Sequence, residues 1–200
     1  MREYHVGVIG YGFMGKTHTH SYKTIPLYYT NLPFTIRLEG ICDTVPGVAE
    51  EARQMQGFAY ATTDPERIIS DPNIDIVSIC TPNVFHKDLV LRALRAGKHV
   101  YCDKPLTATA EESREILEAL PSFAGQTTQV ALQMRFYPAV MRAKELIREG
   151  RIGRVFLFQC DYLHSSGIDP NKTLSWKQNR AFGGGGVLLA CQFFGFCDAL

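Results

Sequence analysis

The stretch "VGVIGYGFMGKTHTH", residues 6–20, places three glycines at the spacing G-x-G-x-x-G directly after a short apolar run. The apolar run predicts a buried strand, and the residues that follow predict a helix that begins inside the motif. Gly10 can make the tight turn off the strand, Gly12 lets the backbone approach a phosphate, and Gly15 lets the helix pack close to the sheet. Because glycine makes up 17 of the 200 residues, the motif alone is weak evidence and needs its context.

The context is an alternation of short apolar runs with segments of helical spacing, which predicts a parallel sheet covered by helices. The expected strands are residues 5–10, 34–43, 57–62, 74–80, 98–105 and 127–136. The expected helices run from the glycine motif to about Tyr22 and from Pro46 onward, then over 64–70, 86–97, 107–120 and 138–150, with Asp64 as the N-cap of the third. The predicted fold class is therefore α/β: a doubly wound Rossmann sheet, followed by a truncated α+β domain.

The alternation of strands and helices stops after Gly153, where the strand-like run "RVFLFQCDYLH", residues 154–164, is not followed by a predicted crossover helix. We expect residues 1–125 to form a dinucleotide-binding Rossmann domain, with its sixth strand and a linking helix extending to about residue 153. Residues 154–200 would then begin a C-terminal substrate and oligomerisation domain that is incomplete.

The charge balance excludes some classes of partner. Lysine and arginine number 21 against 20 acidic residues, so no net field draws the chain to nucleic acid or to an anionic membrane. No apolar run reaches the ~18 residues that span a bilayer, and the start of the chain lacks the apolar stretch of a signal peptide. We therefore expect a cytoplasmic protein with a small-molecule partner.

The six cysteines include no C-x-x-C pair, and four of them stand at the ends of apolar runs. Reduced thiols in the core are the expected state, because disulfides do not persist in the cytosol. No ligand spacing supports a zinc site, so no metal is predicted.

Polar residues stand where the predicted strands end, which is the edge at which open parallel sheets bind ligands. Asp43 ends the second strand, where its carboxylate can accept hydrogen bonds from both ribose hydroxyls and would repel a 2′-phosphate, so NAD is favoured over NADP. Its distance past Gly15 exceeds the usual ~20 residues because a long loop precedes the strand. A purely structural aspartate at a strand end is the alternative.

A second group of polar residues follows the fourth and fifth strands: Thr81, Asn83, His86 and Lys104. These side chains are expected to project into one cleft. Lys104, between an acid and a proline, could donate a proton to an alkoxide or take one from a hydroxyl. The alternatives are a solvated surface lysine at 104 and an ordinary first-turn helix residue at His86.

With these residues in place, the chain resembles the Gfo/Idh/MocA family of nicotinamide-dependent oxidoreductases over nearly its whole length. The resemblance is carried, in order, by "GVIGYGFMGKTH", "ICD", "VSICTPNVFH", "AGKHVYCDKPLT", "QMRFYPAV", "ELIREGRIGRV" and "GGGGVLL". It implies hydride transfer between NAD and a carbon bearing a hydroxyl, usually of a sugar or polyol. Lys104 matches the family's catalytic lysine, while Asp103 replaces the glutamate of its E-K-P signature, and Trp176 with Lys177 match a tryptophan and basic pair near the cofactor.

Combining motif and resemblance, the residues expected to contact the cofactor are Gly10, Gly12, Phe13, Met14, Gly15, Asp43, Thr81, Pro82, Asn83, His86, Asp103, Lys104, Gln133, Trp176 and Lys177.

The chain also departs from the family pattern after its glycine run. Ala190 stands where catalytic members carry an aspartate, and Phe194 stands where they carry a histidine. The chain ends at Leu200, short of a complete member, as expected of a fragment or a frame-shifted product. Two interpretations stay open: an NAD-dependent oxidoreductase, poorly active in this truncated form, and a non-catalytic NAD-binding sensor of the same fold. In both, an unpaired strand edge beyond residue 154 predicts a homo-oligomer.

Overall fold

The computed structural model describes residues 1–159, 161, 169, 171, 173 and 175–183. The chain divides into two compact units, Met1–Ala131 and Leu132–Leu200. The predicted functional domains, 1–125 and 154–200, remain predictions, because a division by contacts assigns no function.

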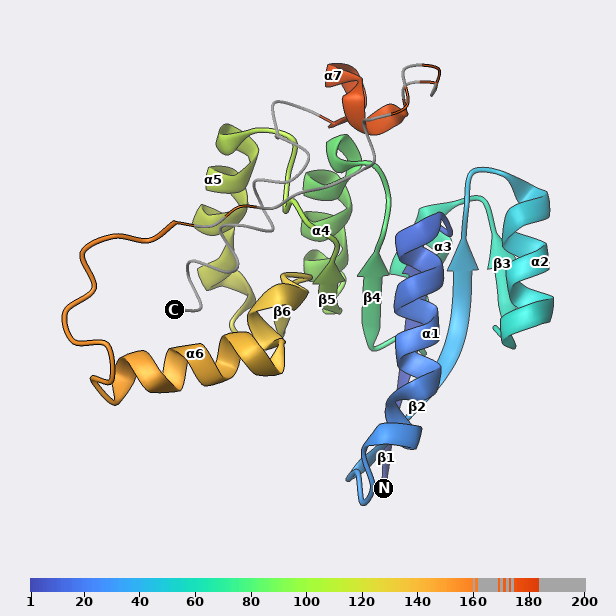
Figure 1. Cartoon of the computed structure of the whole chain (residues 1–200). Helices are drawn as coiled ribbons and strands as arrows, with labels where there is room; N and C mark the ends of the chain where they lie inside the picture. The colour runs from blue at the N-terminus through green and yellow to red at the C-terminus, as the bar shows by residue number, and fades with distance from the viewer. Residues whose placement is uncertain (160, 162–168, 170, 172, 174, 184–200) are drawn as a thin grey trace. The chain divides into compact units, whose positions relative to one another are not determined.

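The first unit is built on a six-stranded parallel sheet of strand order β3-β2-β1-β4-β5-β6 (Figure 1). Its strands are β1 (Arg2–Ile9), β2 (Phe34–Cys42), β3 (Tyr60–Thr62), β4 (Ile76–Ile79), β5 (His99–Cys102) and β6 (Thr128–Val130). This order, with β1 beside β4 at the centre, is that of a doubly wound Rossmann sheet. The predicted fold class of this part of the chain is thereby confirmed.

Helices cover both faces of the sheet, because side chains of successive strand residues point to opposite faces. The helices are α1 (Phe13–Tyr28), α2 (Pro46–Gln56), α3 (Pro65–Ile69), α4 (His86–Arg95) and α5 (Ala110–Ala119), with 3₁₀ turns η1 (Asn83–Phe85) and η2 (Leu120–Phe123). In β1, Val6 and Val8 pack in a core with residues of α1 and α2, whereas Ile9 packs in a second core with residues of α3, α4 and α5. Each face of the sheet is therefore covered by its own apolar core.

Local signals set several of the helix boundaries. Asp64 caps α3 by accepting a hydrogen bond from the N–H of Glu66, as predicted. Thr109 and Glu112 form a capping box at the start of α5. Helix α1 runs past the predicted end at Tyr22 and contains Pro26 in its last turn, where the missing N–H of proline removes one intrahelical hydrogen bond.

The second unit contains η3 (Gln133–Phe136), α6 (Pro138–Arg148), η4 (Trp176–Gln178) and α7 (Arg180–Gly183). Two strand predictions differ here from the structure. The sixth strand was expected over 127–136, but β6 ends at Val130, because its partner β5 ends at Cys102 and leaves nothing further to pair with. Residues 154–159 form no strand, since the described part of this unit offers none to pair with; the rest of that predicted strand, apart from Asp161, lies outside the described residues.

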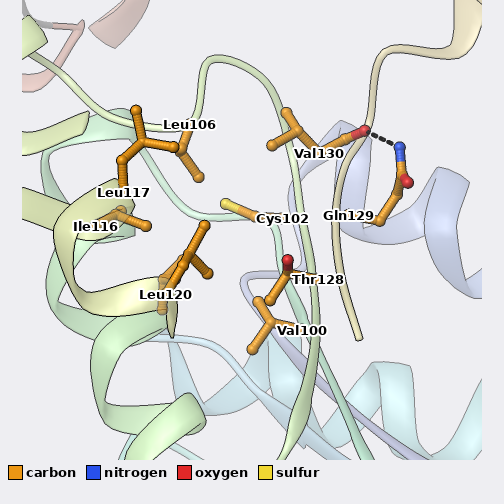
Figure 2. A pocket seen from close by; sticks show the side chains of 10 residues that line it. Val100, Cys102, Leu106, Ile116, Leu117, Leu120, Thr128, Gln129 and Val130 are labelled. Atoms are coloured by element: carbon orange, nitrogen blue, oxygen red, sulfur yellow. Dashed lines mark hydrogen bonds between the residues drawn. The ribbon is translucent and has the colours of Figure 1, made fainter. Parts of the chain in front are cut away.

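An apolar cavity of about 210 Å³ lies in the first unit between α5 and the β5–β6 end of the sheet (Figure 2). Its lining is Val90, Val100, Cys102, Leu106, Ile116, Leu117, Leu120, Thr128, Gln129 and Val130. The amide of Gln129 donates to the carbonyl oxygen of Val130, 2.9 Å away. The thiol of Cys102 is the one ionisable group in this lining, and burial raises its pKa well above the usual range, so the cavity offers no group suited to acid–base chemistry near neutral pH.

No helix in the described part of the chain combines the length and the apolar character needed to cross a membrane.

Candidate functional site: the carboxyl edge of the sheet

The register of the parallel strands brings the predicted site residues of the first unit to one edge. Ile9 pairs with Cys42 on one side and with Ile79 on the other, and Ile79 pairs with Cys102. The strands therefore end level with one another. The residues that follow are Gly10, Asp43, Cys80 and Asp103. The N–H groups of Gly10, Cys80 and Asp103 donate across the edge to the last carbonyl of the neighbouring strand, each over 2.8 Å.

The three glycines of the motif have different structural roles. Gly10 has φ +92°, and a Cβ there would lie 2.7 Å from the carbonyl oxygen of Cys80. A Cβ on Gly15 would lie 2.0 Å from the carbonyl oxygen of Gly10. A Cβ on Gly12 would meet no atom within 4 Å. Packing therefore demands glycine at positions 10 and 15, whereas at 12 the protein itself leaves open space.

Gly12 is the N-cap of α1, and no side chain caps this helix. The first N–H groups of a helix have no partner within it, and together with the helix dipole they attract an anion. Open space at Gly12 in front of an uncapped helix of 16 residues fits a phosphate group.

Asp43 is held beside the glycine turn by its own hydrogen bonds. One carboxylate oxygen accepts from the N–H of Tyr11 over 2.9 Å, and the other accepts from the N–H of Val45 over 3.0 Å. The carboxylate is thereby fixed next to the turn, and each oxygen retains a lone pair that can accept from a hydroxyl. This arrangement fits a ribose diol.

Residues after β4 add a polar surface to the same edge. The hydroxyl oxygen of Thr81 is buried and has no hydrogen-bond partner. An orphaned buried hydroxyl costs roughly 1–3 kcal/mol, so a ligand that bonds it would recover that cost. Pro82 follows and Asn83 is buried. Phe13, by contrast, is exposed and Met14 half-buried at the start of α1.

The residues after β5 place Lys104 at this edge, half-buried. The carboxylate of Asp103 is nearly buried and accepts a hydrogen bond from the backbone N–H of Lys104 over 2.8 Å. The peptide bond from Lys104 to Pro105 is cis. Asp103 thus bonds to the backbone of the lysine that follows it.

The position of His86 differs from the expectation that it projects into a cleft. Its side chain is fully buried, with Nδ1 2.8 Å from the carbonyl oxygen of Pro105 and Nε2 2.9 Å from that of Thr81. As the first residue of α4, it points toward the sheet rather than outward. Both ring nitrogens are engaged by backbone, so the ring has no polar edge left for a ligand.

Sequence reasoning missed a buried polar network beneath the edge. His18 of α1 has Nδ1 2.9 Å from the hydroxyl oxygen of Ser78 and 3.3 Å from the sulfur of Cys80, and its ring stacks on Tyr101. Burial lowers the pKa of His18, partly offset by the charge of Asp103. Burial, with a smaller contribution from Asp103, raises the pKa of Cys80 to about 12. The signal was the spacing of Gly15, His18 and Thr19 on one helix face.

The thiols of Cys42, Cys80 and Cys102 are free; Cys42 and Cys102 lie in the core, as predicted, whereas Cys80 is half-buried. Cys160, Cys191 and Cys197 lie outside the described residues. Within the described part of the chain, no group of three or more histidine, cysteine or acidic side chains could hold a metal ion.

Three predicted cofactor contacts belong to the second unit. Gln133 begins η3, and Trp176 and Lys177 begin η4, whose N-terminus is capped by a capping box between Ser175 and Gln178. The amine of Lys177 lies 5.8 Å from the centre of the Trp176 ring. Their contact with a cofactor remains a prediction. Ala190 and Phe194 lie outside the described residues.

Comparison with known proteins agrees with this geometry. Residues 4–131 match a family model described as "Oxidoreductase family, NAD-binding Rossmann fold", and residues 140–193 match one described as "GFO/IDH/MocA C-terminal domain".

Among curated relatives, levoglucosan dehydrogenase of Pseudarthrobacter phenanthrenivorans is 39% identical over 188 residues, which cover 94% of this chain and 48% of that protein. Inositol 2-dehydrogenase/D-chiro-inositol 3-dehydrogenase of Lactiplantibacillus plantarum is 30% identical, covering 84% of this chain and 45% of that protein. A solved levoglucosan dehydrogenase in complex with NADH superposes with a TM-score of 0.94 at 37% identity, covering 100% of this chain and 54% of that one. The chain thus spans about half the length of these relatives.

Proposed function

Because the chain belongs to the Gfo/Idh/MocA family of oxidoreductases, we propose that its first unit binds NAD and that Lys104 moves the proton when a sugar or polyol hydroxyl is oxidised. The observation that carries the proposal is the edge described above. There an uncapped helix with open space at Gly12, the oriented carboxylate of Asp43 and the orphaned hydroxyl of Thr81 lie along neighbouring strand ends.

Each of these groups suits a different part of a dinucleotide. The N–H groups at the start of α1 would hold the pyrophosphate, and Asp43 would accept hydrogen bonds from the adenosine ribose. The hydroxyl of Thr81 would bond a polar group of the same ligand. A carboxylate at position 43 would repel a 2′-phosphate, so NAD is favoured over NADP.

NAD, when bound, supplies the acceptor for the hydride that leaves the substrate carbon. The chain's own part in the reaction is to handle the proton. In its neutral form the amine of Lys104 can take the proton of the substrate hydroxyl, and in the reverse direction its ammonium form can return that proton to the carbonyl oxygen. Asp103 holds the backbone of Lys104 while this happens.

The substrate class rests on the relatives, which are named as dehydrogenases of levoglucosan and of inositols. These names favour catalysis over the alternative of a non-catalytic sensor, and they favour a polyhydroxylated ring as the substrate. The cytoplasm, expected from the sequence, stays our proposal for the location.

Calorimetric titration with NAD and NADP, followed by a panel of sugars and polyols, tests this function. We expect tighter binding of NAD and NAD reduction with at least one polyol. Lys104→Ala should lower turnover by about 10²- to 10⁴-fold, the usual contribution of a general acid or base. Lys23→Ala, at an exposed position of α1, is the matched control and should not change it. Absence of NAD binding would refute the proposal.

We also propose that the chain associates with copies of itself through its second unit. The side chains of Ile152, Phe156 and Leu157, which are close in sequence, are exposed to 63%, 92% and 74%, and exposed apolar side chains that gather in one patch favour an interface. Sedimentation equilibrium at tens of micromolar should find a dimer or larger assembly that Phe156→Asp weakens. Met55→Asp, at an exposed methionine of α2, is the control. A monomeric unmutated chain would contradict this.

A further inference from the structure

The ring of His86 connects two segments of chain at the carboxyl edge of the sheet. Thr81 precedes it by five residues and lies at the end of β4, while Pro105 follows it by 19 residues and comes directly after Lys104. Both partners are carbonyl oxygens, which only accept hydrogen bonds, so the ring is the donor in each bond; a neutral ring, which carries one N–H, donates to one carbonyl and packs against the other, whereas a protonated ring donates to both. A side chain with nitrogens on opposite sides of a rigid ring suits this span.

The segment on the Thr81 side also contacts the glycine turn. A Cβ on Gly10 would lie 3.1 Å from the backbone nitrogen of Thr81 and 2.7 Å from the carbonyl oxygen of Cys80. The ring of His86 therefore holds the turn after β5 to a segment that already packs against the proposed phosphate site.

Lys104 is held on both sides along the backbone. Before it, Asp103 accepts from the N–H of Lys104 and donates its own N–H to the carbonyl of Ile79 over 2.8 Å. After it, the carbonyl of Pro105 lies 2.8 Å from Nδ1 of His86. Fixing the backbone at both neighbours limits the directions in which the Lys104 side chain can extend.

We propose that His86 is a positioning residue for Lys104, acting through the Pro105 carbonyl and not by touching substrate or cofactor. This inference rests on the proposed function, in which Lys104 moves the proton. In this role the buried ring of His86 holds the amine of Lys104 at a fixed distance from the glycine turn. The group that moves the proton and the proposed dinucleotide site are thereby kept in register.

The chain contains a matched control for this role. Lys98 is also buried, and its amine donates to two backbone carbonyls, those of Asp71 and Ile74, over 2.6 and 2.7 Å. It precedes β5, whereas Lys104 follows that strand. Lys98→Met removes the same kind of bond with little change of volume, but leaves the turn around Lys104 intact.

The test measures how fast Lys104 is acylated by a limiting amount of acetic anhydride, relative to Lys23 and Lys144 in the same sample, by peptide mass spectrometry. In His86→Leu we expect the relative rate at Lys104 to rise at least threefold, because the turn is released. His86→Gln keeps N–H donors in its side-chain amide and should show a smaller rise. Lys98→Met should lower the melting temperature without moving the ratio.

The proposal is overturned if folded His86→Leu acylates Lys104 at the unmutated ratio, or if Lys98→Met raises the ratio as much. If His86→Leu does not fold, His86→Asn and His86→Gln are compared instead. The asparagine amide is shorter and cannot reach the Pro105 carbonyl as well as the glutamine amide, so the relative acylation rate at Lys104 must rise more in His86→Asn. Equal rates in the two variants refute the proposal. The measurement needs neither NAD nor turnover. Failure of the positioning role is therefore distinguishable from failure of the dehydrogenase function, which NAD titration reports separately.

Discussion

Replacing Gly12 by alanine separates the demands of the fold from those of the ligand. The backbone of Gly12 has φ −69° and ψ −161°, which alanine adopts without strain, and the added Cβ would meet no protein atom within 4 Å. Alanine is a poorer N-cap than glycine, so stability should fall by less than about 1 kcal/mol. The same methyl group would occupy the space in front of the helix, where the pyrophosphate is proposed to lie.

We therefore expect Gly12→Ala to unfold in urea near the unmutated midpoint, yet to bind NADH at least tenfold more weakly, a loss of about 1.4 kcal/mol. NADH fluorescence titration and urea denaturation measure the two effects on the same preparation. Gly15→Ala should behave differently, because its Cβ would lie 2.0 Å from the carbonyl oxygen of Gly10. This oxygen belongs to the backbone and cannot move away as a side chain could, and overpacking of this kind costs about 1–3 kcal/mol or more.

Gly125→Ala is the matched control, because a Cβ there also meets nothing within 4 Å, but Gly125 precedes β6 and therefore lies at the amino edge of the sheet, opposite the carboxyl edge. It should change the free energy of unfolding by less than about 1 kcal/mol and leave NADH affinity unchanged. If Gly12→Ala binds NADH with the affinity of the unmutated chain, the assignment of the N-terminus of α1 as the phosphate site is refuted.

Three further predictions follow from individual side chains. Asp43→Ala should narrow the preference for NAD over NADP in calorimetric titration, because it removes both the ribose acceptor and the charge that repels a 2′-phosphate; an unchanged ratio would contradict the ribose assignment. The 200-residue chain should turn over slowly, since Ala190 and Phe194 stand where catalytic members of the family carry an aspartate and a histidine. The double substitution Ala190→Asp with Phe194→His should raise the rate; a kcat near the enzyme median of about 10 s⁻¹ in the unmutated chain would show that neither group is needed. Burial lowers the pKa of His18 in the folded protein. As the pH falls, the unfolded state therefore becomes protonated at a higher pH than the folded state, so the free energy of unfolding should be unaffected above about pH 6.5 and should decrease below it. Urea midpoints between pH 8 and pH 5 measure this, and His18→Asn should flatten the slope.

Local sequence patterns were enough to predict the succession of strands and helices along the chain and several residues that meet at the carboxyl edge of the sheet. Apolar periodicity and the glycine spacing are local, and in a parallel sheet every strand end falls on one edge. Gly10, Asp43 and Lys104 could therefore be placed together without coordinates. The cap at Asp64 was equally local, because it depends on one side chain and the first turn of its own helix.

Features that depend on residues far apart in the chain became visible only in the folded structure. Residues 131–136 and 154–159 have strand-like composition but no strand, because a strand requires a neighbour to complete its backbone hydrogen bonds. His86 was expected in the cleft, yet its ring lies in the core, since the two carbonyls that engage it come from segments 5 and 19 residues away. The glycine motif does not distinguish Gly12, where a Cβ would have open space, from Gly15, where it would not. They differ because the carbonyl of Gly10 folds back against one position and away from the other.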